Sequence, residues 1–150
     1  MAQVNFYTLP SSEAQSRLLF VCRLTEKAYS LGHRIHIQTE SDQQSKLLDD
    51  LLWQYASSSF IPHRTLDGSS DSRDPVSLGT SLAGAKHADV LINLGKKASQ
   101  AGDQFSRINE VISADPESLG QGRNRYRDYK GNNYQIATFK LSILDGCPAA

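Results

Sequence analysis

Residues 123–130, RNRYRDYK, place four cations and two tyrosines in eight positions of a chain with zero formal net charge. If this segment is helical, the i, i+3, i+4 and i+7 positions share one face and carry Arg123, Tyr126, Arg127 and Lys130. Guanidinium groups beside a tyrosine ring suit a carboxylate together with an aromatic or apolar side chain. They also suit phosphates with a stacked base, and a merely solvated basic face is the third possibility. Arg125 and Tyr129 point elsewhere, and we expect one of them to point inward.

A second cluster, LLWQYASSSFIPH at 51–63, contains the only tryptophan of the chain, Trp53. Trp53 lies near the end of a predicted helix whose leucines already supply a core stripe, so we expect its indole at the edge of that stripe. Phe60, Ile61 and Pro62 follow a serine-rich turn. One interpretation is a core residue followed by the start of a strand. The other is an exposed aromatic and proline patch of the kind that anchors protein interfaces.

Phosphate-binding loops are the next chemistry to consider, and the sequence lacks them. The first predicted strand runs into LPSSEAQ, which has no glycine. The segment GQGRNR at 120–125 matches only half of a G-x-G-x-x-G pattern. In GTSLAGAKH, Gly79 and Gly84 have P-loop spacing, but Ala85 separates Gly84 from Lys86 and no serine or threonine follows. The sequence therefore predicts no nucleotide-binding loop and no cofactor.

Catalytic and metal-binding patterns are also missing. The four histidines do not have metal-ligand spacing, and we expect each to be a surface or hydrogen-bonded structural residue: His33, His36, His63 and His87. No serine lies in a G-x-S-x-G elbow. Asp49 and Asp50 are expected to be solvated, and Cys22 and Cys147 to be reduced and structurally passive. The sequence predicts neither a catalytic residue nor a metal ligand.

Size and composition limit the class of protein. A length of 150 residues suits one domain with a hydrophobic core. Lysine plus arginine equals aspartate plus glutamate, 16 against 16, which argues against a general nucleic-acid coat. No apolar run is long enough for a membrane span, and the N-terminus has no basic region leading into an apolar stretch. We expect a cytosolic protein.

Strand and helix patterns alternate along the chain, which is typical of a parallel α/β sheet. The expected strands are 4–9, 34–39, 76–79, 89–95, 109–114 and 134–141. The first expected helix ends near Leu31, with Gly32 as its C-terminal cap. Three further helices are expected at 43–55, 98–108 and 117–130. The domain is expected to span 1–141, and 142–150 to form a flexible C-terminal tail.

Two segments, LLWQYASSSFIPH and RNRYRDYKGNNYQIATFK, resemble motifs of the chi subunit of bacterial DNA polymerase III. The strands VNFYTL, RIHIQT and DVLINL stand in matching order, so the resemblance extends to about Leu141. It implies an α/β, Rossmann-like three-layer fold with a mostly parallel central sheet and no bound nucleotide. The tail 142–150 lies outside it.

The resemblance also implies a role as a non-enzymatic adaptor in DNA replication. Chi subunits pair with the psi subunit of the clamp loader and bind the acidic C-terminal tail of single-stranded-DNA-binding protein. The psi-facing region corresponds to Trp53, Phe60, Ile61 and Pro62, and the tail-binding helix to Arg123, Tyr126, Arg127 and Lys130. The chain departs from the family at Gly120 and Gln121, where a lysine is common. Direct binding of single-stranded nucleic acid by 123–130 stays the alternative, although the neutral net charge disfavours it.

Overall fold

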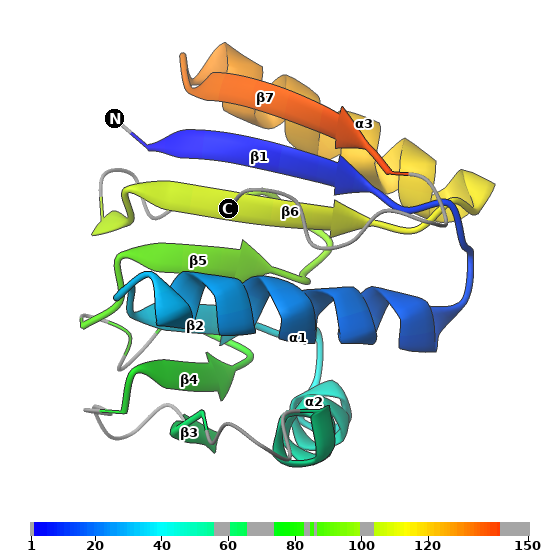
Figure 1. Ribbon diagram of the computed structural model, residues 1–150. Coiled ribbons are helices and arrows are strands. Elements are labelled where there is room, and N and C mark those ends of the chain that lie inside the picture. Colours follow the sequence, from blue (N-terminus) through cyan, green and yellow to red (C-terminus); the bar gives the residue numbers. More distant parts are fainter. Residues whose placement is uncertain are drawn as a thin grey trace.

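Seven parallel strands form one sheet in the described part of the computed structural model of the chain (Figure 1). The structure describes residues 2–55, 61–65, 74–82, 85, 87–99 and 104–141, except for the side chain of Tyr55. Among these residues the strand order is β3-β4-β2-β5-β6-β1-β7, and every pairing is parallel. The strands are β1 Gln3–Thr8, β2 Ile35–Gln38, β3 His63–Thr65, β4 Val76–Gly79, β5 Val90–Asn93, β6 Arg107–Ile112 and β7 Gln135–Lys140. The expected parallel α/β class is confirmed.

Helices cover both faces of the sheet, which makes three layers. They are α1 Ala14–Ser30, α2 Asp42–Tyr55 and α3 Pro116–Gly131. Figure 1 shows α1 and α2 on one face, whereas α3 lies behind β7 and β1 on the other. The core is divided accordingly: Leu24 and Leu48 pack with Ile37 on the first face, and Tyr129 packs with Phe6 on the second. The Rossmann-like three-layer arrangement is therefore confirmed.

The ends of α1 and α3 follow from local sequence. Gly32 follows the last turn of α1 with a φ of 88°, the left-handed conformation that glycine adopts without steric cost, as the C-terminal cap prediction required. At α3, Asp115 is the N-cap, and its carboxylate accepts a hydrogen bond of 3.0 Å from the Ser118 amide. Pro116 occupies the first turn, where its missing N–H has no cost.

A close contact between α3 and the sheet explains a glycine within the helix. A Cβ atom added at Gly122 would lie 2.5 Å from Cδ1 of Ile112 on β6, whereas the same atom at Gly120 would meet open space. The backbone of α3 therefore approaches β6 closely at Gly122. This close approach fixes the distance between α3 and β6, and β6 also supplies a partner for the inward-facing side chains of the helix.

Two expectations about local structure were wrong. The segment 98–108 was expected to be a helix, but its described residues include no α-helical turn, and Arg107 and Ile108 already belong to β6. Pairing with both β1 and β5 outweighs local helix propensity there, because Phe105 and Ile108 become buried. Leu47, expected in the core stripe of α2, is 51% exposed.

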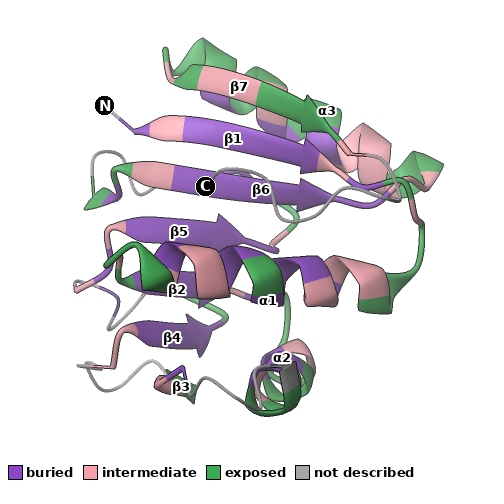
Figure 2. Ribbon diagram, viewed as in Figure 1, coloured by how far each residue is buried: buried purple, intermediate pink, exposed green. Residues whose placement is uncertain are grey.

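Burial is greatest in the central strands and decreases toward the sheet edges, as Figure 2 shows. Strands β4 and β5 are buried along their whole length, whereas most of β7 is exposed or half-buried. Within the described part of the chain, no helix is both long and apolar enough to cross a membrane. The edges of the sheet, rather than its centre, are thus the surfaces available to partners.

A buried histidine should make stability depend on pH. Nε2 of His36 donates to the Ser81 carbonyl at 2.9 Å, and Nδ1 lies 2.8 Å from the Ser77 hydroxyl, from which a neutral ring accepts. Burial lowers the pKa of His36 from 6.5 to about 4. Below pH 6.5 the unfolded chain therefore binds more protons than the folded one, and stability falls as the pH approaches 4.

We expect His36 to account for a loss of about 3 kcal/mol in the free energy of unfolding across this range. Urea unfolding at about pH 7 and about pH 4.5 measures the loss. The variant His36→Gln should show a smaller pH dependence than the parent protein, and equal dependence in the two proteins would contradict the assignment.

Candidate functional site

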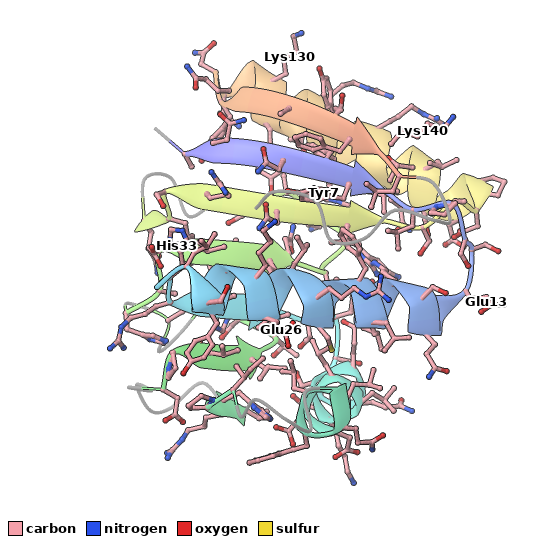
Figure 3. All side chains as sticks on the ribbon, viewed as in Figure 1. Tyr7, Glu13, Glu26, His33, Lys130 and Lys140 are labelled. Carbon is pink, nitrogen blue, oxygen red and sulfur yellow. The ribbon has the colours of Figure 1, made fainter. Side chains whose placement is uncertain are left out.

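The basic face of α3, defined as Arg123, Tyr126, Arg127 and Lys130, lies on the outer side of the helix. Arg123, Arg127 and Lys130 are exposed, and Tyr126 is half-buried. The ring of Tyr126 packs against Phe6 of β1 with 5.6 Å between centroids, and Nζ of Lys130 lies 5.9 Å from its centre. Figure 3 shows Lys130 extending away from the molecule. The face thus offers cations around one partly exposed aromatic ring.

Arg125 and Tyr129 lie on the inner side of the same helix, where both are buried. The sequence led us to expect one inward side chain, and the structure shows two. Nε of Arg125 donates to Oε1 of Glu110 at 2.8 Å, and the hydroxyl of Tyr129 donates to Oε2 at 2.6 Å. Asn93 of β5 donates its side-chain amide to the same Oε2 at 2.8 Å. Glu110 of β6 is therefore the anchor to which α3 is fixed.

Opposing effects act on the buried carboxylate of Glu110, and its pKa is raised on balance. Burial raises the pKa of Glu110, while the Arg125 guanidinium and the donors Tyr129 and Asn93 oppose that rise. Burial and the adjacent Glu110 carboxylate raise the pKa of Tyr129, so its hydroxyl stays protonated and can donate. A buried carboxylate with three donors, one of them cationic, meets the requirement for burying charge.

The network continues into the connection that follows β5. Nη1 of Arg125 lies 3.4 Å from the Lys96 carbonyl, and the Ser99 amide donates to the Tyr129 hydroxyl at 2.9 Å. Tyr129 thus donates one hydrogen bond and accepts another. The inner side of α3 therefore holds both β6 and residues 96–99, while the outer side is left for a ligand.

The second candidate surface surrounds Trp53, which is 53% exposed near the end of α2. Its indole packs against the ring of His63, with 4.7 Å between centroids. Nδ1 of His63 donates to the Ile61 carbonyl at 2.7 Å, and Nε2 lies 3.0 Å from Oδ1 of Asp49. Asp49, expected to be solvated, is half-buried in this contact. The indole thus packs against His63 of β3 while about half of the side chain stays exposed.

The remaining residues of this region occupy different environments. Ile61 is 3% exposed and belongs to the core beneath α1 and α2. Pro62 is half-buried next to β3, and Phe60 lies outside the described residues. Both interpretations of the sequence therefore hold in part, because Ile61 is a core residue before a strand and Trp53 is an exposed aromatic.

The two surfaces lie at opposite edges of the sheet. Strand β3, next to α2, is the last strand at one end of the order, and β7, next to α3, is the last at the other. Figure 1 shows α2 and α3 on opposite sides of the molecule. Partners at the two surfaces would be separated by the five strands between β3 and β7.

The other chemical candidates do not come together. His33 pairs with Asp89 at 2.8 Å, and the buried His36 bonds within the sheet. Among the described residues, no three His, Cys, Asp or Glu side chains are grouped to hold a metal ion. Burial raises the pKa of Cys22 to about 12, which keeps this thiol protonated. GQGRNR lies within α3 and forms no loop.

Glu110, Asn93 and His63 were not recognised from the sequence as positioning residues, although His63 was expected to be a surface or hydrogen-bonded structural residue. A signal for Glu110 was present, because a single carboxylate within the apolar run INEVI requires a buried partner. For Asn93 and His63 no local signal exists, because their contacts join elements far apart in the chain.

Comparison with known proteins identifies relatives of one kind. The family described as "DNA polymerase III chi subunit, HolC" matches residues 1–137. A DNA polymerase III subunit chi from Pseudomonas aeruginosa is 33% identical over 141 residues, covering 94% of this chain and 98% of the relative. Proteins of the same name from Escherichia coli and Haemophilus influenzae are 24% and 23% identical, and cover 93% and 89% of this chain. The matched region spans 100% of the Escherichia coli protein and 93% of the Haemophilus influenzae protein.

Removing the charge of Glu110 should destabilise the protein strongly. In Glu110→Gln the buried Arg125 loses its counter-ion, so we expect the free energy of unfolding to fall by about 3–5 kcal/mol. Urea unfolding followed by circular dichroism measures the change. Glu117→Gln, an exposed glutamate in the first turn of α3, is the matched control and should cost less than about 1 kcal/mol. Similar losses in both variants would contradict the anchoring role.

Proposed function

The chain belongs to the family of DNA polymerase III chi subunits, which are replication accessory proteins, and we propose that it acts as a non-catalytic adaptor in the cytoplasmic replisome. One partner is the psi subunit of the clamp loader, and the other is the C-terminal tail of single-stranded-DNA-binding protein. The observation that carries the tail-binding part is the basic face of α3, where exposed cations surround the half-exposed Tyr126.

The chemistry of that tail matches the basic face. It ends in acidic residues followed by proline, phenylalanine and a free carboxylate. In our proposal Arg123 binds the terminal carboxylate, Tyr126 contacts the phenyl ring, and Arg127 with Lys130 attract the acidic residues. Exposed cations of this kind increase the rate of encounter and make binding sensitive to salt.

The dimensions of the face also suit a short peptide. Arg123 and Lys130 are seven positions apart on a helix, which corresponds to about 10 Å along its axis. An extended peptide covers that distance with about three residues. The face can therefore contact the last few residues of a tail at once. Because Glu110 and Gly122 fix α3 against β6, the face is formed before the peptide arrives and little ordering is needed.

The psi-binding part of the proposal is supported by the exposed indole of Trp53. Large exposed aromatic side chains anchor protein interfaces more often than other residues do. His63 and Asp49 hold the indole from beneath. Ile61 lies in the core, so its contribution would be to position Pro62 rather than to contact psi through its side chain. The separation of the two surfaces lets both partners bind together.

Direct binding of single-stranded nucleic acid by 123–130 is the competing function. The same cations and Tyr126 could contact phosphates and a stacked base. The zero formal net charge of the chain argues against binding a polyanion. Titrations with a tail peptide and with an oligothymidylate, performed separately, distinguish the two functions. Tighter binding of the oligothymidylate would reject the tail proposal.

Replacing Arg123 should weaken tail binding selectively. In Arg123→Ala a charge-assisted contact to the carboxylate is lost, so we expect the tail peptide to lose about 1.5–3 kcal/mol of binding free energy. Fluorescence anisotropy with a labelled peptide measures this loss. The control Arg23→Ala removes an exposed arginine from α1, on the opposite face of the sheet, and should bind normally. An unchanged affinity in Arg123→Ala refutes the site.

Replacing Trp53 should affect the other partner only. We expect Trp53→Ala to weaken psi binding by about 2 kcal/mol or more, because a central aromatic contact is removed. Calorimetry with purified psi measures the loss, and the tail peptide is titrated in parallel. Leu47→Ala is the matched control, since Leu47 is an equally exposed apolar residue of α2. Loss of both partners in Trp53→Ala would indicate misfolding or one shared site.

A further inference from the structure

A pocket of about 600 Å³ lies at the carboxyl ends of β2, β4 and β5, away from both surfaces described above. Its walls come from residues 38–41 after β2, from Thr80 and Leu82 after β4, and from Asn93 and residues 95–99 after β5. The volume is in the range of sites that hold small molecules. Figure 1 shows these strands running in the same direction, so their ends meet at one side of the sheet.

The topology of the sheet explains why a pocket forms there. Strands β2 and β5 are neighbours. The chain leaves β2 for α2, whose Leu48 packs on the α1 side of the sheet. It leaves β5 for a connection whose Ala98 and Phe105 pack on the α3 side. Two adjacent strands whose connections leave toward opposite faces open a crevice, and ligands of parallel α/β proteins bind in such crevices.

Hydrogen bonds from Asn93 and from α3 hold the loop after β5 in place. The Asn93 side chain donates to the Lys97 carbonyl at 2.9 Å and accepts from the Gly95 amide at 3.0 Å. Arg125 contacts the Lys96 carbonyl, and Tyr129 binds the Ser99 amide. The buried Glu110 network therefore preorganises the loop. A preorganised loop can bind a ligand without the cost of ordering itself.

The charge of the pocket is positive on balance. Lys96 and Lys97 line it and are exposed, and neither forms an ion pair with a residue that the structure describes. Glu40, the acidic residue of the lining, lies 3.7 Å from Nη1 of Arg17 and is thus partly neutralised. Asp42, in the first turn of α2 beside the lining, is a further acidic group that a ligand would avoid.

We propose that this pocket binds a small phosphate-bearing ligand, with Lys96 and Lys97 as the groups that neutralise the phosphate. Ser41 and Thr80 in the lining supply hydroxyl groups for further hydrogen bonds. The lining residues that the structure describes include no aromatic side chain, so none of them offers a ring on which a base could stack. Recognition therefore depends on the phosphate group, and a nucleoside without phosphate should not bind.

The segment that nearly matches a P-loop contributes to the wall of this pocket. GTSLAGAKH does follow a strand, β4, and its Thr80 and Leu82 reach the pocket. The described residues that come after it, through Asp89, are not helical, so no helix N-terminus receives the phosphate. The lysines come instead from the loop after β5, one strand beyond β2 in the sheet order.

Pyrophosphate is the probe for this site. We expect its addition to ¹⁵N-labelled protein to shift the backbone amides of 39–41 and 95–99, and adenosine to shift none. The double variant Lys96→Gln, Lys97→Gln should lose affinity for pyrophosphate by at least about tenfold, since two charge-assisted contacts are removed. Lys46→Gln, Lys140→Gln makes the same change of net charge at exposed lysines outside the pocket and outside the basic face of α3 and should bind as the parent protein does.

Four results would overturn the proposal, of which the first three concern pyrophosphate itself. They are the absence of shifts at about 10 mM pyrophosphate, an equal loss in both double variants, and shifts confined to α3. An oligothymidylate that shifts the pocket amides as strongly as pyrophosphate at equal phosphate concentration would also overturn it, because a nucleic-acid strand would then be the ligand. Tail binding depends on Arg123 and not on Lys96 or Lys97, so this site and the adaptor function succeed or fail separately.

Discussion

The carboxylate of Glu110 is the interaction on which the arrangement of this molecule depends. It is buried in β6 and receives donors from α3 and from β5: Arg125, Tyr129 and Asn93. Removing any donor would leave a charge or a polar group without its partner in the core, so the three elements are fixed together. The orientation of α3 follows, because a helix whose inner face is bonded to one carboxylate can present only the opposite face to solvent.

This constraint links two candidate binding surfaces that come from different parts of the chain. On the outer side of α3, Arg123 and Lys130 are exposed because Arg125 and Tyr129 are occupied inside. On the inner side of α3, Arg125 of the same network also contacts the Lys96 carbonyl, and the side chains of Lys96 and Lys97 line the pocket. One buried network thus supports a face suited to a peptide and a pocket suited to a phosphate.

The sheet itself separates the two candidate protein-binding surfaces. All strands among the described residues are parallel, so each connection crosses a face, and the two edges β3 and β7 lie at opposite ends. Trp53 belongs to the first edge and Tyr126 to the second. In the proposed adaptor function, a partner at one edge would therefore leave the other edge uncovered.

Much of this was determined by the sequence alone. Helix and strand periods identify most elements and the α/β class, and the spacing of Arg123, Tyr126 and Arg127 places them on one face, because both depend on residues a few positions apart. Only the tertiary structure decided that Arg125 and Tyr129 share Glu110, that Trp53 is exposed over His63, and that Arg107 and Ile108 begin a strand. These outcomes depend on contacts between distant segments, and local spacing carries no information about which buried group a side chain will meet.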